Sequence, residues 1–377
     1  MPPFVAHFAD LPDPRVDRTK LHALLDILVI ALCTVICGGE GWEDMSEFGH
    51  AKEPFLREQL GLALKNGIPS PDTFRRVFAR LDPDAFTRCF TAWVATLRRQ
   101  TKGEVVSIDG KALRHSFDTA TGQAPIHVIS AWAGKNRLVL SQLKVADKSN
   151  EIPALPALLA LLDLRGCTVT IDAMGCQKAV ARRVIAQGGD YVLALKGNQG
   201  TLHADVAEFF EDARAREFGG VAYQYTETLD KDHGRIEKRR YWLVEEVAWL
   251  VARHDWAGLS SISMIERIRQ VGDAVTSEVS YTINSLTGSV AKLARAVRGH
   301  WGIENHVHHV LDVTFDEDDC RIRKENAPQN LATVRHLALN LLRQEETHRR
   351  GIQGRIRRAG WDDDYLRQVL APQCCGV

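Results

Sequence analysis

The 377-residue sequence lacks the features that mark several large classes of protein. Its eight cysteines form no pair of CxxC motifs, which argues against a zinc ribbon, and nothing indicates a secreted disulfide scaffold. Residues 27–37 are the most apolar run, and they are too few to cross a bilayer. The preceding segment carries Asp10, Asp13 and Asp17. These acids make it a poor signal peptide, so we expect a cytoplasmic protein.

The chain also lacks a net charge, because 48 Lys and Arg balance 48 Asp and Glu. Proteins that bind nucleic acid usually carry an excess of base. The charge is uneven, however: residues 51–102 hold ten Lys and Arg against five acids, and residues 320–358 hold ten against three. Such stretches can steer DNA to a neutral protein, although a solvated helix face explains them equally well. The length predicts two or three domains.

Hydrophobic spacing predicts a helical N-terminal domain over residues 1–102, which we expect to bind DNA. Its first 20 residues, with Pro12 and Pro14, are predicted to form an extended arm. Within residues 68–81, Ser70 and Pro71 predict the start of a helix with an apolar inner face. The outer face of this helix holds three candidate DNA-binding residues, Arg75, Arg76 and Arg80. This pattern suits a helix-turn-helix, or equally a surface helix of a bundle.

From residue 103 onward, short strands alternate with helices. We predict strands at 104–109, 126–132, 137–145, 167–172 and 190–195, and helices at 151–162, 175–187 and 201–213. The order predicts an α/β fold in which a mixed sheet carries helices on its faces. A β-rich insertion is predicted at about 221–285, followed by helices from about 289 and over 326–345. The catalytic domain would thus span residues 103–345, with a C-terminal tail over 346–377.

Two of the predicted strands end in a carboxylate. Residues 105–109 and 169–172 are short β-branched runs that stop at Asp109 and Asp172. A third acid, Glu304, falls on a helical stripe of apolar residues between Trp301 and His308. We therefore expect Glu304 to be buried. A buried carboxylate needs a metal ion or a cation, and an Arg partner is the alternative to metal.

Carboxylates from two strands and a helix can together hold Mg²⁺, for which Mn²⁺ is a possible substitute. Asp109, Asp172 and Glu304 are therefore predicted to bind the metal and to catalyse phosphoryl transfer on DNA backbones. A further strand stops at Lys196, and ligands of α/β sheets collect at such ends. Five more candidate DNA-binding residues follow from these positions: Lys196, Asn198, Gln199, His300 and His308. The spacing of His300, Glu304 and His308, taken alone, would also suit zinc.

Several ordered motifs resemble the H-repeat-associated family of bacterial insertion-sequence transposases. They are Ser107–Lys111, Asp147–Ile152, Thr170–Met174 with Gln177, Leu195–Gln199, His233–Glu237 with Arg239–Trp242, and His300–Asn305 running to Leu311–Val313. Leu11–Arg15 and Gly41–Asp44 resemble the family's associated N-terminal domain. The resemblance covers nearly the whole chain. It implies a ribonuclease-H-like core with a β-strand insertion and a DDE triad of Asp109, Asp172 and Glu304.

The resemblance also implies a function, which is Mg²⁺-dependent cleavage of DNA at element ends and strand transfer to target DNA. The expected partners are transposon-end DNA and target DNA, bound by a homodimer in a synaptic complex. Related transposases place Arg four residues before the glutamate and Lys seven after it, where this chain has His300 and Leu311. His300, His308 or Lys196 are candidates to substitute. The alternatives are a nuclease that does not join strands and a domesticated DNA-binding protein with an inactive core.

Overall fold

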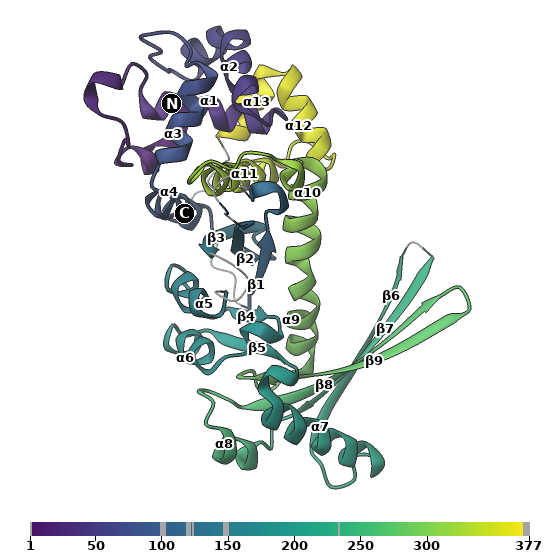
Figure 1. The fold of residues 1–377 in the computed structure, drawn as a ribbon. Coiled ribbons are helices and arrows are strands. Elements are labelled where there is room, and N and C mark those ends of the chain that lie inside the picture. The colour runs from purple at the N-terminus through teal and green to yellow at the C-terminus, as the bar shows by residue number, and fades with distance from the viewer. Residues whose placement is uncertain are drawn as a thin grey trace. The chain divides into compact units, whose positions relative to one another are not determined.

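The computed structural model describes residues 2–98, 103–117, 122, 124–145, 151–232 and 234–371. The chain divides into two compact units, whose helices and strands are labelled in Figure 1. The first unit holds residues 1–100, 110–150 and 304–377, and the second holds residues 101–109 and 151–303. The chain therefore passes from one unit to the other directly after Asp109 and directly before Glu304.

The first unit is mostly helical, and helix α11 (Ala327–Gln344) lies at its centre. Every residue of α11 except the last is buried, and α1 (Leu24–Ile36) is buried along nearly its whole length. The remaining α-helices are α2 (Trp42–Ala51), α3 (Pro71–Arg80), α4 (Pro83–Leu97), α10 (His309–Thr314), α12 (Ile352–Trp361) and α13 (Asp363–Leu370). Shorter 3-10 segments are η1 (Pro3–Phe8), η2 (Asp17–Thr19), η4 (Arg114–Ser116) and η9 (Glu317–Asp319), and π-helices are η3 (Phe55–Gln59) and η8 (Glu304–His308).

Helix α11 is held to the antiparallel hairpin of β2 (His127–Ala133) and β3 (Leu138–Val145). The Asn340 side chain donates to the carbonyl of Val139 at 2.9 Å and accepts from its backbone N–H at 2.8 Å. The Gln142 amide donates to the Thr333 hydroxyl at 2.5 Å. Buried polar groups are stable only when they are hydrogen-bonded. These bonds therefore fix the position of α11 against β3.

The prediction of an extended arm over residues 1–20 is wrong. Phe4 and Phe8 are buried, and their rings lie 6.2 and 5.6 Å from those of Trp93 and Phe86. The prolines do prevent a regular helix, but burial of large aromatic rings outweighs that local preference. The N-terminal segment is thus part of the core of the first unit.

The second unit contains a mixed sheet, as predicted. Strands β1 (Val105–Ala112), β4 (Thr168–Ile171) and β5 (Asp190–Leu195) run parallel, and β9 (Ala274–Asn284), β8 (Ser261–Val271), β7 (Arg235–Val244) and β6 (Tyr223–Asp232) follow in antiparallel pairs. Over the described residues the order of the nine strands is β3-β2-β1-β4-β5-β9-β8-β7-β6. Strand β1 contributes its first five residues to the second unit and its last three to the first.

The helices of the second unit are α5 (Glu151–Ala160), α6 (Lys178–Ala186), α7 (Gly200–Ala215), α8 (Ala248–His254) and α9 (Val290–Ile303). Leu293 of α9 packs with Tyr241 and Ile265 in the main apolar cluster of this unit. A Cβ atom at Gly299 would lie 3.0 Å from a methyl group of Val105. Glycine at this position therefore lets α9 approach β1 closely.

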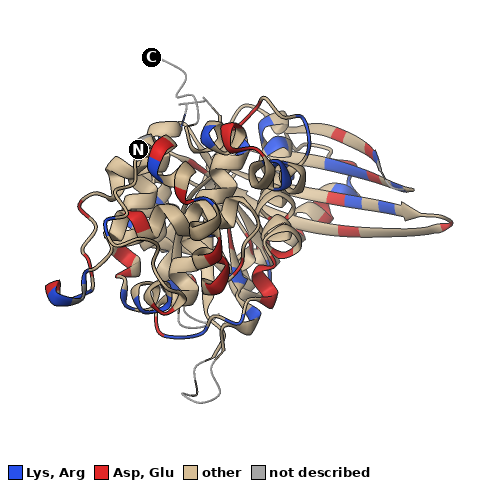
Figure 2. Cartoon of the chain, turned by 90° about the horizontal axis from the view of Figure 1, so that it is seen from above, with Lys and Arg blue, Asp and Glu red and all other residues tan. Residues whose placement is uncertain are grey.

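Where a β-rich insertion was predicted, at about 221–285, strands β6 to β9 form the two long hairpins seen in Figure 1. Strand β6 is the last in the strand order and so forms an edge of the sheet. On β6, the side chains of Tyr223, Tyr225 and Leu229 are exposed. Figure 2 shows positive and negative residues interspersed along these hairpins. The insertion therefore presents a mixed surface rather than a uniformly basic one.

The other predicted elements agree with the structure within a few residues. The helix predicted at 175–187 begins later, at Lys178, because Ala173–Gly175 form a separate 3-10 turn, η6. The motif at Asp147–Ile152 lies largely outside the described residues. Among the described residues, no helix has both the length and the apolar character needed to cross a membrane.

Candidate active site

Asp109 and Asp172 lie on neighbouring parallel strands in the second unit. The register of β1 and β4 pairs Ile108 with Ile171, so each aspartate follows a paired residue. Adjacent strands are about 4.8 Å apart, so the two carboxylates leave neighbouring points of the sheet. Asp172 directly follows β4, whereas Asp109 lies inside β1, which continues to Ala112. The prediction that β1 stops at Asp109 is wrong in this respect.

The loop that carries Asp172 is held by hydrogen bonds from its own residues and from the end of β5. The Asp172 carboxylate accepts from the N–H of Gly175 at 3.3 Å. Asn198 donates to the carbonyl of Ala173 at 2.6 Å. Gln199 donates to the carbonyl of Cys176 at 2.9 Å. These two amides therefore support the loop around the acid, and a contact with DNA remains a prediction for them, as it does for the exposed Lys196.

A neutral hydrogen-bond network connects the two strands to helix α9. The Thr170 hydroxyl donates to that of Ser107 at 3.2 Å, and Ser107 donates to the carbonyl of Gly299 at 3.0 Å. The Nδ1 atom of His300 lies 3.2 Å from the Thr170 hydroxyl oxygen. Because both hydroxyl protons are used in this chain, Nδ1 of His300 is the donor to Thr170. The network fixes the tautomer of His300 and holds it beside the strand of Asp172.

Glu304 is exposed, so the expected burial of this acid is wrong. About half of its side chain is accessible (53%), and Trp301 is also exposed, whereas Leu311 is buried. The predicted stripe assumes a continuous α-helix, but α9 ends at Ile303 and Glu304–His308 form the π-helix η8. A π-turn adds a residue and shifts the phase of the side chains. Of the three residues whose spacing also suited zinc, Glu304 and His308 remain neighbours.

His308 lies beside Glu304 in the first unit. Its Nδ1 atom is 3.7 Å from a carboxylate oxygen of Glu304, and its side chain is 7% exposed. A role of His308 in contacting DNA is still only a prediction.

A buried ionic cluster surrounds Lys111, at the end of β1 that belongs to the first unit. Its Nζ atom contacts the carboxylate of Asp312 on α10 and lies 2.8 Å from that of Glu317. Glu317 is nearly inaccessible and also faces Arg335 of α11 at 3.8 Å. His336, the residue after Arg335 in α11, is also buried, and this burial lowers its pKa to about 4.

The charges of this cluster outweigh the effect of burial. Burial alone would lower the pKa of Lys111, but attraction by Glu317 and hydrogen bonds with Asp312 and Glu317 raise it overall. Burial alone would raise the pKa of Glu317, but the positive charges of Lys111 and Arg335 lower it. Both groups are therefore charged at neutral pH.

The predicted basic face of α3 is present. Phe74, Val77 and Phe78 are buried, and the outer face carries Arg75, Arg76 and Arg80, all exposed. The side chains of Arg75 and Arg76 lie 2.5 and 3.6 Å from Asp72, which reduces their net charge. Their contact with DNA remains a prediction.

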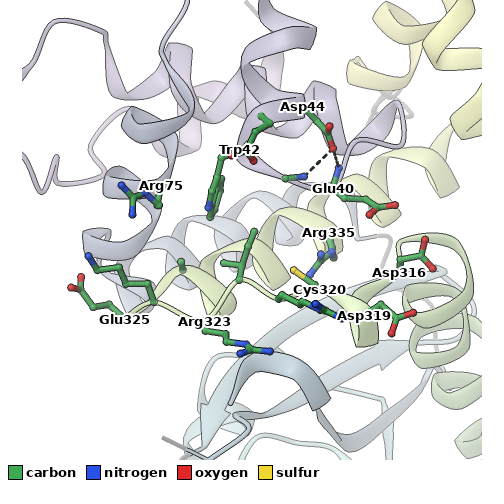
Figure 3. A pocket seen from close by; sticks show the side chains of 16 residues that line it. Glu40, Trp42, Asp44, Arg75, Asp316, Asp319, Cys320, Arg323, Glu325 and Arg335 are labelled. Atoms are coloured by element: carbon green, nitrogen blue, oxygen red, sulfur yellow. Dashed lines mark hydrogen bonds between the residues drawn. The ribbon is translucent and has the colours of Figure 1, made fainter. Parts of the chain in front are cut away.

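Arg75 also lines an open pocket of about 970 Å³ in the first unit. In Figure 3, Arg75 lies on one side of this pocket and the carboxylates of Glu40, Asp316 and Asp319 lie on the other. Repulsion from Asp316 helps burial to raise the pKa of Glu40. Six acidic and five basic residues line the pocket, so its surface is mixed in charge.

Three of the ten basic residues between 320 and 358 are buried rather than available to DNA, namely Arg335, Arg343 and Arg355. Arg355 donates to the carbonyls of Leu342 at 2.5 Å and of His348 at 2.9 Å. It thereby satisfies carbonyls at the end of α11 and in the segment that follows it. Part of this positive charge is therefore structural.

Comparison with known proteins identifies the family of the chain. The transposase DDE domain family matches residues 100–341. The chain belongs to the DDE transposase family. A second family, described as DDE_Tnp_1-associated, matches residues 5–94. The predicted resemblance to H-repeat-associated insertion-sequence transposases is thereby confirmed, together with the assignment to an α/β fold.

Relatives of the DDE transposase family match almost the full length of this chain. One, named "H repeat-associated putative transposase YhhI", from Escherichia coli, is 38% identical over 97% of each chain. A second, named "Putative transposase YncI", from Escherichia coli O157:H7, is 37% identical over 96% of this chain and 92% of its own length. An uncharacterized protein of Xanthobacter autotrophicus is 48% identical over 74% of this chain and 93% of its own.

Sequence reasoning missed the polar contacts on either side of Asp109. Ser107 and Thr170 each stand two residues before an aspartate. These matching positions on two strands were the signal that could have predicted the contact between their hydroxyls. Lys111 and Asp312 lie within recognised motifs, but their contact joins residues 201 positions apart. No spacing rule connects two such positions.

Proposed function

We propose that this protein is an insertion-sequence transposase that cleaves DNA at the ends of its element and transfers the strands to target DNA. The observation that carries the proposal is the register of β1 and β4, which brings Asp109 and Asp172 to neighbouring points of one sheet. Membership of the DDE transposase family supports the same reading. We assign Asp109, Asp172 and Glu304 as the catalytic acids.

The donor set fits a hard divalent cation. Carboxylate oxygens are the ligands that Mg²⁺ prefers, and Mn²⁺ accepts the same ligands. Asp109 is half-buried, Asp172 is exposed and pinned to Gly175, and Glu304 is exposed beside His308. Asp109, Asp172 and Glu304 would hold the metal, which when bound activates the attacking oxygen and stabilises the departing one.

The residues of the chain orient the three acids and leave them open to a large substrate. The amides of Asn198 and Gln199 hold the loop after Asp172, and the network from Ser107 to His300 ties both strands to α9. Exposure of Asp172 and Glu304 suits a DNA backbone, which cannot enter an enclosed pocket.

Cleavage and joining are the same displacement at phosphorus with different nucleophiles. Water attacks the phosphodiester in cleavage and releases a 3′-hydroxyl. In joining, that hydroxyl attacks a target phosphodiester, forms a new P–O bond and releases a new 3′-hydroxyl. One set of acids can therefore serve both reactions. A homodimer would hold the two element ends together while each end is cut and joined.

The test is an assay of the purified protein with Mg²⁺ and DNA carrying the terminal sequences of its element. Nicking at the ends and joining to target DNA are expected. Asp109→Ala should lower both by more than about 100-fold, since even residues that only support metal ligands contribute about 10- to 100-fold. The matched control is Asp163→Asn, because Asp163 pairs with Arg165 at 2.7 Å on the surface of the same unit. Full activity of Asp109→Ala would refute the proposal.

A nuclease without strand joining is distinguished by supplying ends that are already cut. A transposase joins a free 3′-hydroxyl end to target DNA, whereas such a nuclease leaves it unchanged. A DNA-binding protein with an inactive core would bind end DNA without cleaving it in the presence of Mg²⁺ or Mn²⁺.

A further inference from the structure

Lys111 has an environment that the catalytic assignment does not explain. Its side chain is 10% exposed and faces three carboxylates, those of Asp312, Glu317 and Asp318. Glu317 is 2% exposed and Asp312 is 31% exposed. All of these residues belong to the first unit. A buried cation that faces three carboxylates differs from an ordinary solvent-exposed ion pair.

Stability alone is a weak reason for such a cluster. Taking charges out of water is costly, and well-packed apolar residues in place of a buried ion pair are often as stable or more so. Buried charges instead have strict geometric requirements, because each must keep its partners at short range. The cluster is therefore better suited to fixing positions than to adding stability.

The positions that the cluster connects are informative. Lys111 stands two residues after Asp109 on β1, and side chains two apart on a strand lie on the same face. Asp312 lies on α10, which directly follows the π-helix η8 that begins with Glu304. Glu317 in turn reaches Arg335 of the central helix α11 at 3.8 Å. The cluster thus joins the end of β1, the helix after Glu304 and the core of the unit.

We propose that Lys111 is a positioning residue, which holds α10 through Asp312 and the following turn η9 through Glu317, and so sets the orientation of the metal-binding carboxylate of Glu304. This inference rests on the proposed function, because it assumes that Glu304 is a metal ligand. In this role Lys111 acts through α10 and not by contact with metal or DNA. Its removal should therefore weaken metal binding, even in protein that remains folded.

The experiment measures binding of Mn²⁺ to the full-length protein by electron paramagnetic resonance, without DNA. Lys111→Met leaves Glu317 without its nearest cation, so this variant is paired with the double variant Lys111→Met/Glu317→Gln, which removes both charges. Asp312→Asn is a third, milder variant, because Lys111 keeps its bond to Glu317. Lys52→Met is the matched control, since Lys52 forms an ion pair with Asp363 at 2.7 Å in the same unit.

The expected result is a rise of at least about tenfold in the Mn²⁺ concentration for half-saturation in the double variant, with a smaller rise in Asp312→Asn. Lys52→Met should bind Mn²⁺ like the unchanged protein. Wild-type binding in folded Asp312→Asn and in the folded double variant would overturn the inference, because Lys111 would then be merely structural. If only the single variant Lys111→Met fails to fold, Mn²⁺ binding by Asp312→Asn and by the double variant still tests the inference.

The same titration separates this inference from the proposed function. Loss of Mn²⁺ binding in Asp109→Asn and Asp172→Asn, together with unchanged binding in the Lys111 variants, would leave the proposed function standing and overturn only the role of Lys111. Binding that survives both aspartate substitutions would overturn the proposed metal site, and the role of Lys111 with it.

Discussion

Two polar networks attach to strand β1, one on each side of Asp109 in the sequence. The network at Ser107 is neutral, and it runs through Thr170 to His300 in the second unit. The network at Lys111 is ionic, and it runs to Asp312 and Glu317 in the first unit. The strand that carries the proposed catalytic acid Asp109 is thus supported by two different kinds of interaction.

The difference between the networks lies in what happens when one member is lost. A hydrogen bond between neutral groups contributes only about 0.5–1.5 kcal/mol to stability. Removing one partner of a buried ion pair leaves an uncompensated charge and costs about 3–5 kcal/mol. The ionic side of β1 should therefore tolerate almost no single change, whereas the neutral side should tolerate several. The predictions below test this contrast.

The largest effect is expected for Lys111→Met. Loss of the cation leaves the buried carboxylate of Glu317 with Arg335 as its nearest cation, at 3.8 Å. The free energy of unfolding should fall by about 3–5 kcal/mol. Urea unfolding of Lys111→Met and of the control Lys52→Met, whose ion pair is partly exposed, measures the difference. Equal losses in the two variants would contradict the contrast.

The second effect is a partial recovery in the double variant Lys111→Met/Glu317→Gln. Replacing Glu317 by a neutral amide removes the uncompensated charge that the first substitution creates. Coupling between residues in contact is about 0.5–3 kcal/mol, so the double variant should be more stable than the sum of the two single changes implies. A double-mutant cycle by urea unfolding measures this, and strict additivity would indicate that the two groups do not interact.

The third effect concerns pH. The pKa of Glu317 is lowered in the folded protein, because the charges of Lys111 and Arg335 outweigh burial. Its contribution to stability is therefore present above the ordinary value of 4.5 and is lost as pH falls through the lower folded value. One such group changes the unfolding free energy by at most about 1.4 kcal/mol per pH unit. Unfolding followed between pH 5 and pH 2 should show a smaller decrease in the double variant than in the unchanged protein.

The pKa of Lys111 is shifted in the opposite direction to that of Glu317. It is raised in the folded protein, mainly by Glu317 and Asp312 acting against burial. Its contribution is therefore present below the ordinary value of 10.5 and is lost as pH rises through the higher folded value. The double variant Lys111→Met/Glu317→Gln, which lacks this amine, should therefore lose less stability at high pH than the unchanged protein.

The smallest effect is expected for Thr170→Val on the neutral side. Valine has the shape of threonine but lacks the hydroxyl that joins His300 to Ser107. The loss of unfolding free energy should be about 1 kcal/mol, measured by urea unfolding beside Lys111→Met. A loss as large as that of Lys111→Met would show that the neutral network is no more tolerant than the ionic one.

How far the sequence predicted this structure depends on whether each feature is local. The strands before Asp109 and Asp172 were predictable because β-branched runs mark buried strands within a few residues. The arrangement of Lys111 with Asp312 was not, because ion-pair partners 201 residues apart leave no periodic signal. The burial of Phe4 and Phe8 was not predicted for a similar reason. Their ring partners, Trp93 and Phe86, lie 89 and 78 residues further along the chain.

The environment of Glu304 shows a different limit. Its stripe was extrapolated from a regular period, and that period is correct at Leu293 and at Leu311, which are both buried. It fails between them at Trp301 and Glu304, which are exposed where α9 ends and the π-helix η8 begins. Side-chain periodicity does not reveal such a change, because the residues on both sides still fit the same pattern.

The π-helix η8 also makes the length of this segment matter as much as its composition. One residue of an α-helix corresponds to a turn of about 100° around the axis. A lineage that deleted a single residue between Glu304 and His308 could keep every recognisable motif and still turn its glutamate to a different side. Under the proposed function, copies of the gene with such a deletion would no longer support transposition, although a search based on motifs would still find them intact.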